Sequence, residues 1–149
     1  MLKKIAVVLG FVPVAMLAQE TKVEMKNLPQ AVRKTVQEQT RNATLRGLSK
    51  EVEHGETFYE AETTVEGKSR DVLINASGAV VEVEEATTLS AIPEPARKAF
   101  EQRAGVSGKI LRVESVTRGS SVSYEAVIQK GGRKSEFAVN ADGSPARED

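Results

Sequence analysis

An internal duplication limits the fold of this chain more than any other feature of its sequence. Three short blocks occur twice, in the same order and at nearly the same spacing. The pairs are Leu28–Lys34 with Ile92–Lys98, Tyr59–Ala61 with Tyr124–Ala126, and Val72–Gly78 with Phe137–Gly143. One extra residue between the first and second blocks of the later copy explains the small change in spacing. The sequence therefore predicts two copies of one structural unit, in residues 19–88 and 89–149.

Each copy is predicted to begin with a short helix. Pro29 and Pro93 suit the first turn of a helix, where a missing N–H leaves no bond unmade. Apolar residues then recur at a spacing that gives one narrow apolar face. They are Leu28, Val32 and Val36 in the first copy and Ile92, Ala96 and Phe100 in the second. The helices should end near Arg41 and Gly105, since glycine accepts the left-handed conformation of a helix cap.

Antiparallel strands are predicted to follow each helix. Alternating patterns cover residues 48–53, 57–65, 70–75 and 79–84 in the first copy, and 109–117, 122–129 and 136–140 in the second. The alternation is irregular in the first strand of each copy, which leaves a β-bulge open. Gly67-Lys68 and Gly131-Gly132 are predicted hairpin turns, and the last strand of the second copy is truncated. The prediction is an α+β fold of two tandem repeats, each a three- to four-stranded antiparallel meander with a helix on one face.

Residues 1–18 have the layout of a secretory signal peptide. Lys3 and Lys4 precede an apolar stretch that ends at Ala18, shorter than the roughly 20 residues of a membrane-spanning helix. No cysteine follows this stretch, which excludes a lipid anchor. We therefore expect an exported protein, cleaved near Ala18, that meets the membrane only during export.

The composition excludes several classes of function. The chain has no cysteine, so it has no disulfide, no thiolate-bound metal and no thiol nucleophile. Its single histidine, His54, precedes Gly55 at a predicted turn, and no motif for serine catalysis or phosphate binding occurs. The 21 basic and 21 acidic residues give no excess positive charge for nucleic acid. We therefore expect no enzyme activity, no catalytic residue, no cofactor and no nucleic-acid partner, and we assign no metal ligand.

The two copies resemble the PepSY and PepSY-like domain family. The resemblance rests on a helix with Leu-Pro-x-x-Val-x-Lys, a strand centred on Tyr-Glu-Ala, and a strand that ends in Asn-Ala-(Ser/Asp)-Gly. Two such units in tandem cover residues 27–149 and are similar in architecture to the beta-lactamase inhibitory protein. The resemblance implies a bacterial protein, periplasmic or extracellular, with a role in binding or restraining peptidases, and it supplies no catalytic residues.

Acidic residues concentrate in the first copy. Between Glu51 and Glu94 there are eleven acidic residues and only two basic ones. Phe58 shares one side of its strand with Glu60 and Glu62, away from the predicted core, and Leu73 and Val127 have outward registers. An apolar residue on a charged, solvent-facing strand is typical of an interface hot spot, although packing between the repeats would bury the same residues.

These patterns lead to two alternative functions. The first is an exported, non-enzymatic protein-binding module that inhibits or regulates a peptidase or another enzyme. Its open sheet faces would engage an envelope or secreted protein through Phe58, Glu60, Glu62, Leu73 and Val127. The alternative is a cell-envelope sensor that binds a cation or small ligand through the acidic sheet of the first repeat, and charge reversal at Glu82 and Glu84 would then abolish binding.

Overall fold

The computed structural model describes residues 20–146, which group into two compact units. The N-terminal unit contains residues 20–85 and Thr117–Ser120, and the C-terminal unit contains residues 86–116 and 121–146. The predicted signal peptide, residues 1–18, lies outside the described residues. Within each unit the strands lie in chain order as a meander and a helix precedes the long strands, so the α+β prediction is confirmed. No helix within residues 20–146 is long and apolar enough to cross a membrane.

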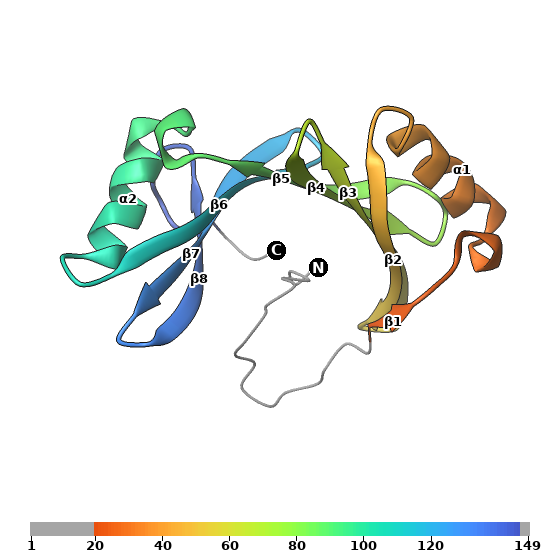
Figure 1. Ribbon diagram of the computed structural model, residues 1–149, viewed down its shortest axis with the longest axis horizontal. Coiled ribbons are helices and arrows are strands. Elements are labelled where there is room, and N and C mark those ends of the chain that lie inside the picture. The colour runs from red at the N-terminus through yellow and green to blue at the C-terminus, as the bar shows by residue number, and fades with distance from the viewer. Residues whose placement is uncertain (1–19, 147–149) are drawn as a thin grey trace. The chain divides into compact units, whose positions relative to one another are not determined.

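In the N-terminal unit, one helix covers one side of the sheet (Figure 1). The two-residue strand β1 (Thr21–Lys22) and a 3-10 turn at Met25–Asn27 precede α1 (Gln30–Gln39). The strands that follow are β2 (Thr44–Glu53), β3 (Glu56–Val65), β4 (Lys68–Asn75) and β5 (Val80–Thr87). The sequence pattern did not predict β1, because a two-residue strand has no period to detect.

The helix-facing side of this sheet forms the first hydrophobic core. Val32 and Val36 of α1 are fully buried, as the helical spacing predicted. Their partners alternate along the strands, because successive side chains of a strand point to opposite faces. The buried members of the core are Leu28, Val32, Val36, Leu48, Tyr59, Ala61, Val72 and Ile74.

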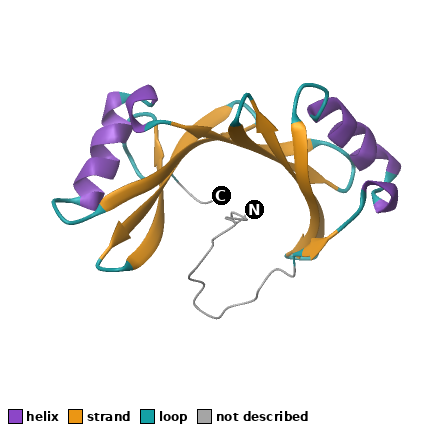
Figure 2. Ribbon diagram, in the orientation of Figure 1, coloured by secondary structure: helices purple, strands orange, loops and turns teal. Residues whose placement is uncertain are grey.

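The C-terminal unit repeats this arrangement of a helix against strands (Figure 2). Its elements are a 3-10 turn at Leu89–Ala91, α2 (Glu94–Ala104), β6 (Lys109–Arg118), β7 (Ser121–Lys130) and β8 (Arg133–Asn140). Phe100 of α2 is fully buried at the centre of the core, together with Ile92, Ala96, Ala104, Val113, Ala126, Ile128 and Val139. Beyond β8, only an isolated bridge from Pro145 to Val139 forms in the described residues, in agreement with the predicted truncation.

The β3–β4 hairpin turn lies one residue earlier in the chain than predicted. The β3–β4 hairpin turns at Glu66 and Gly67, with φ values of 50° and 80°, rather than at Gly67-Lys68. A two-residue hairpin turn of this type needs two successive positive φ values, so the residue before the glycine also enters the left-handed region. Gly131-Gly132 forms the β7–β8 turn as predicted. The bulge left open for the first strand lies in β2, between Leu45 and Gly47.

Candidate functional site

The side of the N-terminal sheet that faces away from α1 is rich in carboxylates. Strand pairing places Ser49 opposite Glu60, Glu60 opposite Leu73, and Leu73 opposite Glu82, in one row across β2 to β5. Neighbouring rows on the same side pair Glu51 with Phe58 and Glu62 with Asp71. We call this surface the acidic face; it comprises Ser49, Glu51, Phe58, Glu60, Glu62, Asp71, Leu73 and Glu82. The predicted grouping of Phe58, Glu60, Glu62 and Leu73 on one side is therefore correct.

The expected exposure of this face is wrong for three of its residues. Phe58 and Leu73 are only 4% and 6% exposed, and Glu60 is 6% exposed. Glu62 is half-buried. Strand periodicity assigns a side chain to a face, but the packing of neighbouring side chains determines whether water reaches it. Phe58 and Leu73 are consequently part of a desolvated floor and do not project as free apolar anchors.

Two arginines neutralise part of the acidic face. Nε of Arg118 lies 2.6 Å from a carboxylate oxygen of Glu82, which is 4% exposed. Nη2 of Arg46 lies 3.0 Å from Oδ1 of Asp71, and Nη1 lies 3.8 Å from Oε2 of Glu62. Arg46 also donates hydrogen bonds to the Thr63 carbonyl oxygen at 3.2 and 3.3 Å. Glu82 thus has a cationic partner already, which weakens its predicted role as a cation ligand.

Among residues 20–146, Glu51 and Glu60 have no such cationic partner. None of the ion pairs within residues 20–146 includes either of them. Oε1 of Glu51 and Oε2 of Glu60 are buried without a hydrogen-bond partner among the described residues, and so is Oγ of Ser49. The acidic face therefore contains two desolvated carboxylates and a desolvated hydroxyl whose bonding capacity is unused.

The electrostatics follow from this burial. Desolvation, reinforced by the negative charges of Asp71, Glu51, Glu62 and Glu20, raises the pKa of Glu60 to about 8. Desolvation and the nearby carboxylates, Glu20 first among them, likewise raise the pKa of Glu51 to about 7. Burial also raises the pKa of Asp71, although Arg46 opposes the shift. The raised pKa values of Glu51 and Glu60 therefore follow from burial without a cationic partner among residues 20–146.

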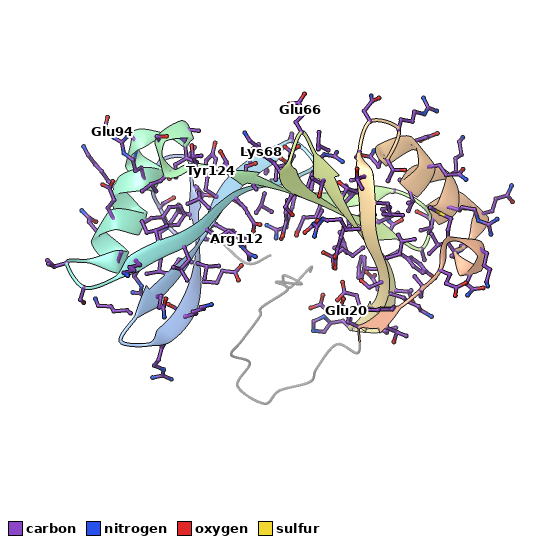
Figure 3. The ribbon with its side chains drawn as sticks, in the orientation of Figure 1. Glu20, Glu66, Lys68, Glu94, Arg112 and Tyr124 are labelled. Carbon is purple, nitrogen blue, oxygen red and sulfur yellow. The ribbon has the colours of Figure 1, made fainter. Side chains whose placement is uncertain are left out.

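Three carboxylates of this region converge. Ligand oxygens of Glu20, Glu60 and Glu62 all lie within 4.8 Å of one another. Glu20 is exposed and immediately precedes β1, where Figure 3 labels it, whereas Glu60 and Glu62 come from β3. The chain before α1 thus adds a third acid to a pair that lies side by side on one strand. This convergence depends on the pairing of β1 with β2 through Thr21 and Lys50.

The remaining predicted residues lie elsewhere. Val127 belongs to the C-terminal unit, where it is half-buried on β7 opposite Glu136 of β8. His54 lies in the exposed β2–β3 turn with a φ of 50°, as predicted, and its Nδ1 is 3.7 Å from Oε1 of Glu53. An exposed imidazole in a hairpin turn offers no positioned base for catalysis.

Sequence reasoning missed four residues of the site. Glu20 is a single acid shortly after the apolar residues of the predicted signal peptide, and Ser49 has no charge to mark it. Arg46 lies at a bulge and Arg118 in a distant hairpin, so neither is near its carboxylate in the sequence. The concentration of acids in residues 51–94 was a usable signal, but it could not separate neutralised carboxylates from uncompensated ones.

Comparison with known proteins identifies the fold. No protein-family model matches the sequence, and no curated protein matches it. A predicted periplasmic protein from Bacteroides eggerthii is 17% identical, with a TM-score of 0.66 over 80% of this chain and 86% of that chain. A DUF2874 family protein from Bacteroides ovatus is 16% identical, with a TM-score of 0.63 over 80% and 85% of the two chains.

A third solved structure has a similar fold. A BLIP-like protein from Bacteroides fragilis is 17% identical, with a TM-score of 0.60 over 82% of this chain and 85% of that chain. These likenesses establish a shared fold, and the architecture expected from the tandem repeat is confirmed at that level. The resemblance to PepSY domains stays a prediction.

Proposed function

We propose that this chain is an exported, non-enzymatic binding module of a bacterium, periplasmic or extracellular, that engages another exported protein through its acidic face. The leader-like residues 1–18 and the fold shared with a predicted periplasmic protein support the location. The fold shared with a BLIP-like protein supports binding over catalysis. Membership of the PepSY-like family and inhibition of a peptidase or another enzyme are the finer parts of the same proposal.

The buried carboxylates of the acidic face that have no cationic partner among residues 20–146 are the observation on which the proposal rests. Glu51 and Glu60 are buried carboxylates without a cation among the described residues. A lysine or arginine of a partner supplies the missing charge and allows both carboxylates to ionise. Because the floor formed by Phe58 and Leu73 excludes water, such a charge pair is stronger here than on an open surface.

The accessible residues of the face determine how a partner reaches it. Glu20 is exposed, and the side chain of Glu62 is 35% exposed. These two carboxylates attract a basic partner and set its approach, which is the usual contribution of charges at the rim of an interface. Glu60 lies behind them and interacts with the side chain that enters. In this arrangement Phe58 and Leu73 support the site from below.

An affinity capture with matched variants tests the proposal. The mature chain, residues 19–149, is immobilised beside a Glu60→Gln/Glu62→Gln variant and exposed to the periplasmic and secreted proteins of the producing organism. We expect a protein that the wild type retains, that the variant loses, and that moderate salt releases, because screening weakens charge attraction.

The control is Glu94→Gln/Glu101→Gln, which removes the same charge from exposed positions of α2. Equal retention by all three proteins, or retention by none, contradicts the proposal. A captured hydrolase is then assayed with and without the mature chain. Loss of its activity on addition of the chain identifies the module as an inhibitor.

A further inference from the structure

We infer that Glu20, Glu60 and Glu62 form a binding site for a divalent cation of the size of Ca²⁺ on the acidic face of the N-terminal unit. The inference goes beyond the proposed function and does not depend on it, since the ion binds the isolated chain without a protein partner. It also moves the cation alternative from Glu82 and Glu84 to a different set of carboxylates.

The first support is geometric. The three ligand oxygens lie within 4.8 Å of one another. Calcium–oxygen distances are about 2.3–2.6 Å, so two oxygens on opposite sides of the ion are separated by about twice that length. A single Ca²⁺ ion can therefore contact all three carboxylates, and water completes its coordination. The smaller Mg²⁺ ion requires oxygens at about 2.0–2.1 Å in an octahedron, which brings opposite ligands closer together.

The second support is the condition of Glu60. Glu60 is only 6% exposed, and its Oε2 has no hydrogen-bond partner among the described residues. A carboxylate removed from water without a partner costs free energy, and an ion at this point would supply the missing contact. Ser49 lies directly opposite Glu60 in the strand pairing, and its Oγ is also buried and unpartnered. Two independent oxygens of the same row therefore have unused bonding capacity.

The basic groups near the site leave it available. Arg46 makes its short contact with Asp71, at 3.0 Å, and its hydrogen bonds to Thr63, while its distance to Glu62 is 3.8 Å. Lys22 lies beside Ser49 in the strand pairing but is exposed. A divalent ion with direct contacts to three carboxylates therefore competes with one long arginine contact and one solvated ammonium group.

Titration calorimetry with CaCl2 and MgCl2 tests the inference. The mature chain, residues 19–149, is freed of metal with a chelator, dialysed, and titrated at pH 8.5 without any partner protein. We expect one Ca²⁺ ion per chain, and binding of Mg²⁺ at least tenfold weaker. Absence of Ca²⁺ binding up to millimolar concentration overturns the inference, and so does equal or tighter binding of Mg²⁺.

Three variants locate the ion. Glu60→Gln should abolish Ca²⁺ binding, and Glu20→Gln should weaken it at least tenfold. Because Glu20 is exposed and precedes β1, its substitution leaves the core intact and keeps the test valid if Glu60→Gln is unstable. Glu94→Gln, on the exposed surface of α2, should bind Ca²⁺ like the wild type. Equal Ca²⁺ binding by the wild type and by both site variants overturns the inference.

The affinity capture separates this result from the proposed function. Binding of Ca²⁺ to the isolated chain, with no protein captured in Ca²⁺ or in chelator, supports the ion site and contradicts protein binding. If chelator-treated protein captures a partner through Glu62 but calorimetry detects no Ca²⁺ binding, the result supports protein binding and overturns the ion site.

Discussion

The two repeats agree on the helix-facing sides of their sheets and differ on the opposite sides. Tyr59 and Ala61 of the first core correspond to Tyr124 and Ala126 in the second. On the helix-free side, Glu60 corresponds to Glu125, and both are buried. Other positions there diverge: Glu51, Glu53, Phe58, Glu62 and Leu73 correspond to Val116, Arg118, Ser123, Val127 and Ala138.

This difference shows which positions of the repeat the fold constrains. The core positions must fill the space between helix and sheet, so the two copies retain apolar residues there. The helix-free side does not pack against a helix, and the N-terminal copy has more acids on it than the C-terminal copy, where Glu114, Glu125 and Glu136 lie on that side. In the C-terminal copy, Arg112 lies on the same strand as the buried Glu114, with 3.3 Å between Nε and Oε2. The corresponding residue of the N-terminal copy is Gly47, which contributes no charge.

The largest expected effect compares the two cores. Phe100 and Val36 occupy corresponding positions of α2 and α1, and both are fully buried. Phe100→Ala should lower the free energy of unfolding by about 3–5 kcal/mol, because it leaves a large cavity. Val36→Ala removes fewer atoms and should cost clearly less. Urea unfolding followed by circular dichroism measures both, and an equal cost would break the correspondence between the cores.

A smaller effect is expected at the Arg118–Glu82 pair. Arg118→Met leaves the buried Glu82 carboxylate without the cation that lies 2.6 Å away. The free energy of unfolding should fall by about 3 kcal/mol, since removal of one partner from a buried pair leaves an uncompensated charge. The double variant Arg118→Met/Glu82→Gln should regain most of the loss. A double variant as unstable as the single one would show that Arg118 acts through packing.

The glycines of the turns after β4 and β8 test whether the repeats share a backbone constraint. A Cβ at Gly78 would lie 2.8 Å from the Ala31 carbonyl, and one at Gly143 would lie 2.6 Å from the Pro95 oxygen. Both have positive φ, so alanine there should cost about 2 kcal/mol in thermal or urea unfolding. Gly55→Ala, at positive φ but in open space, should cost about 1 kcal/mol. Equal losses at all three positions would mean that the contacts with the helices contribute nothing.

The smallest expected effect concerns pH. Glu51 has a raised pKa of about 7, so the folded chain holds a proton that the unfolded chain releases above its ordinary pKa of 4.5. Its contribution to stability is therefore full below pH 4.5 and falls as pH rises through about 7. Glu51→Gln should remove this part of the pH dependence and stabilise the chelator-treated protein at pH 8.5 by about 1 kcal/mol. Unfolding midpoints measured from pH 4 to 9 test this, with Glu101→Gln as the control for lost charge.

The fold could be predicted closely because the same pattern of apolar residues occurs in both repeats. Val32 and Val36 establish a helical face, and Tyr59 and Ala61 establish the inner side of a strand, through spacing alone. The one-residue error at Glu66 arose because a hairpin turn requires a positive φ from the residue before the glycine as well. Strand β1 escaped prediction because its position depends on pairing with Lys50 and not on any local pattern.

The candidate site was predictable only in part. The alternation of side chains between the two faces of a strand predicted that Phe58, Glu60, Glu62 and Leu73 lie on one side of the sheet, since this alternation is a local property. Burial was not predictable, because it depends on how side chains of four strands pack over one another. The neutralisation of Glu82 by Arg118, residues far apart in the sequence, could not be inferred from a count of charges.

The sequence by itself determined the duplication, the order of helix and strands, the two cores and the acidic character of the first sheet, because these properties follow from local spacing and composition. Only the tertiary structure decided which carboxylates are desolvated, which arginine reaches which acid, and that Glu20 meets Glu60 and Glu62. Those outcomes depend on distances between separate strands. Electrostatic energies change steeply over such distances, so they are settled only when the strands have paired.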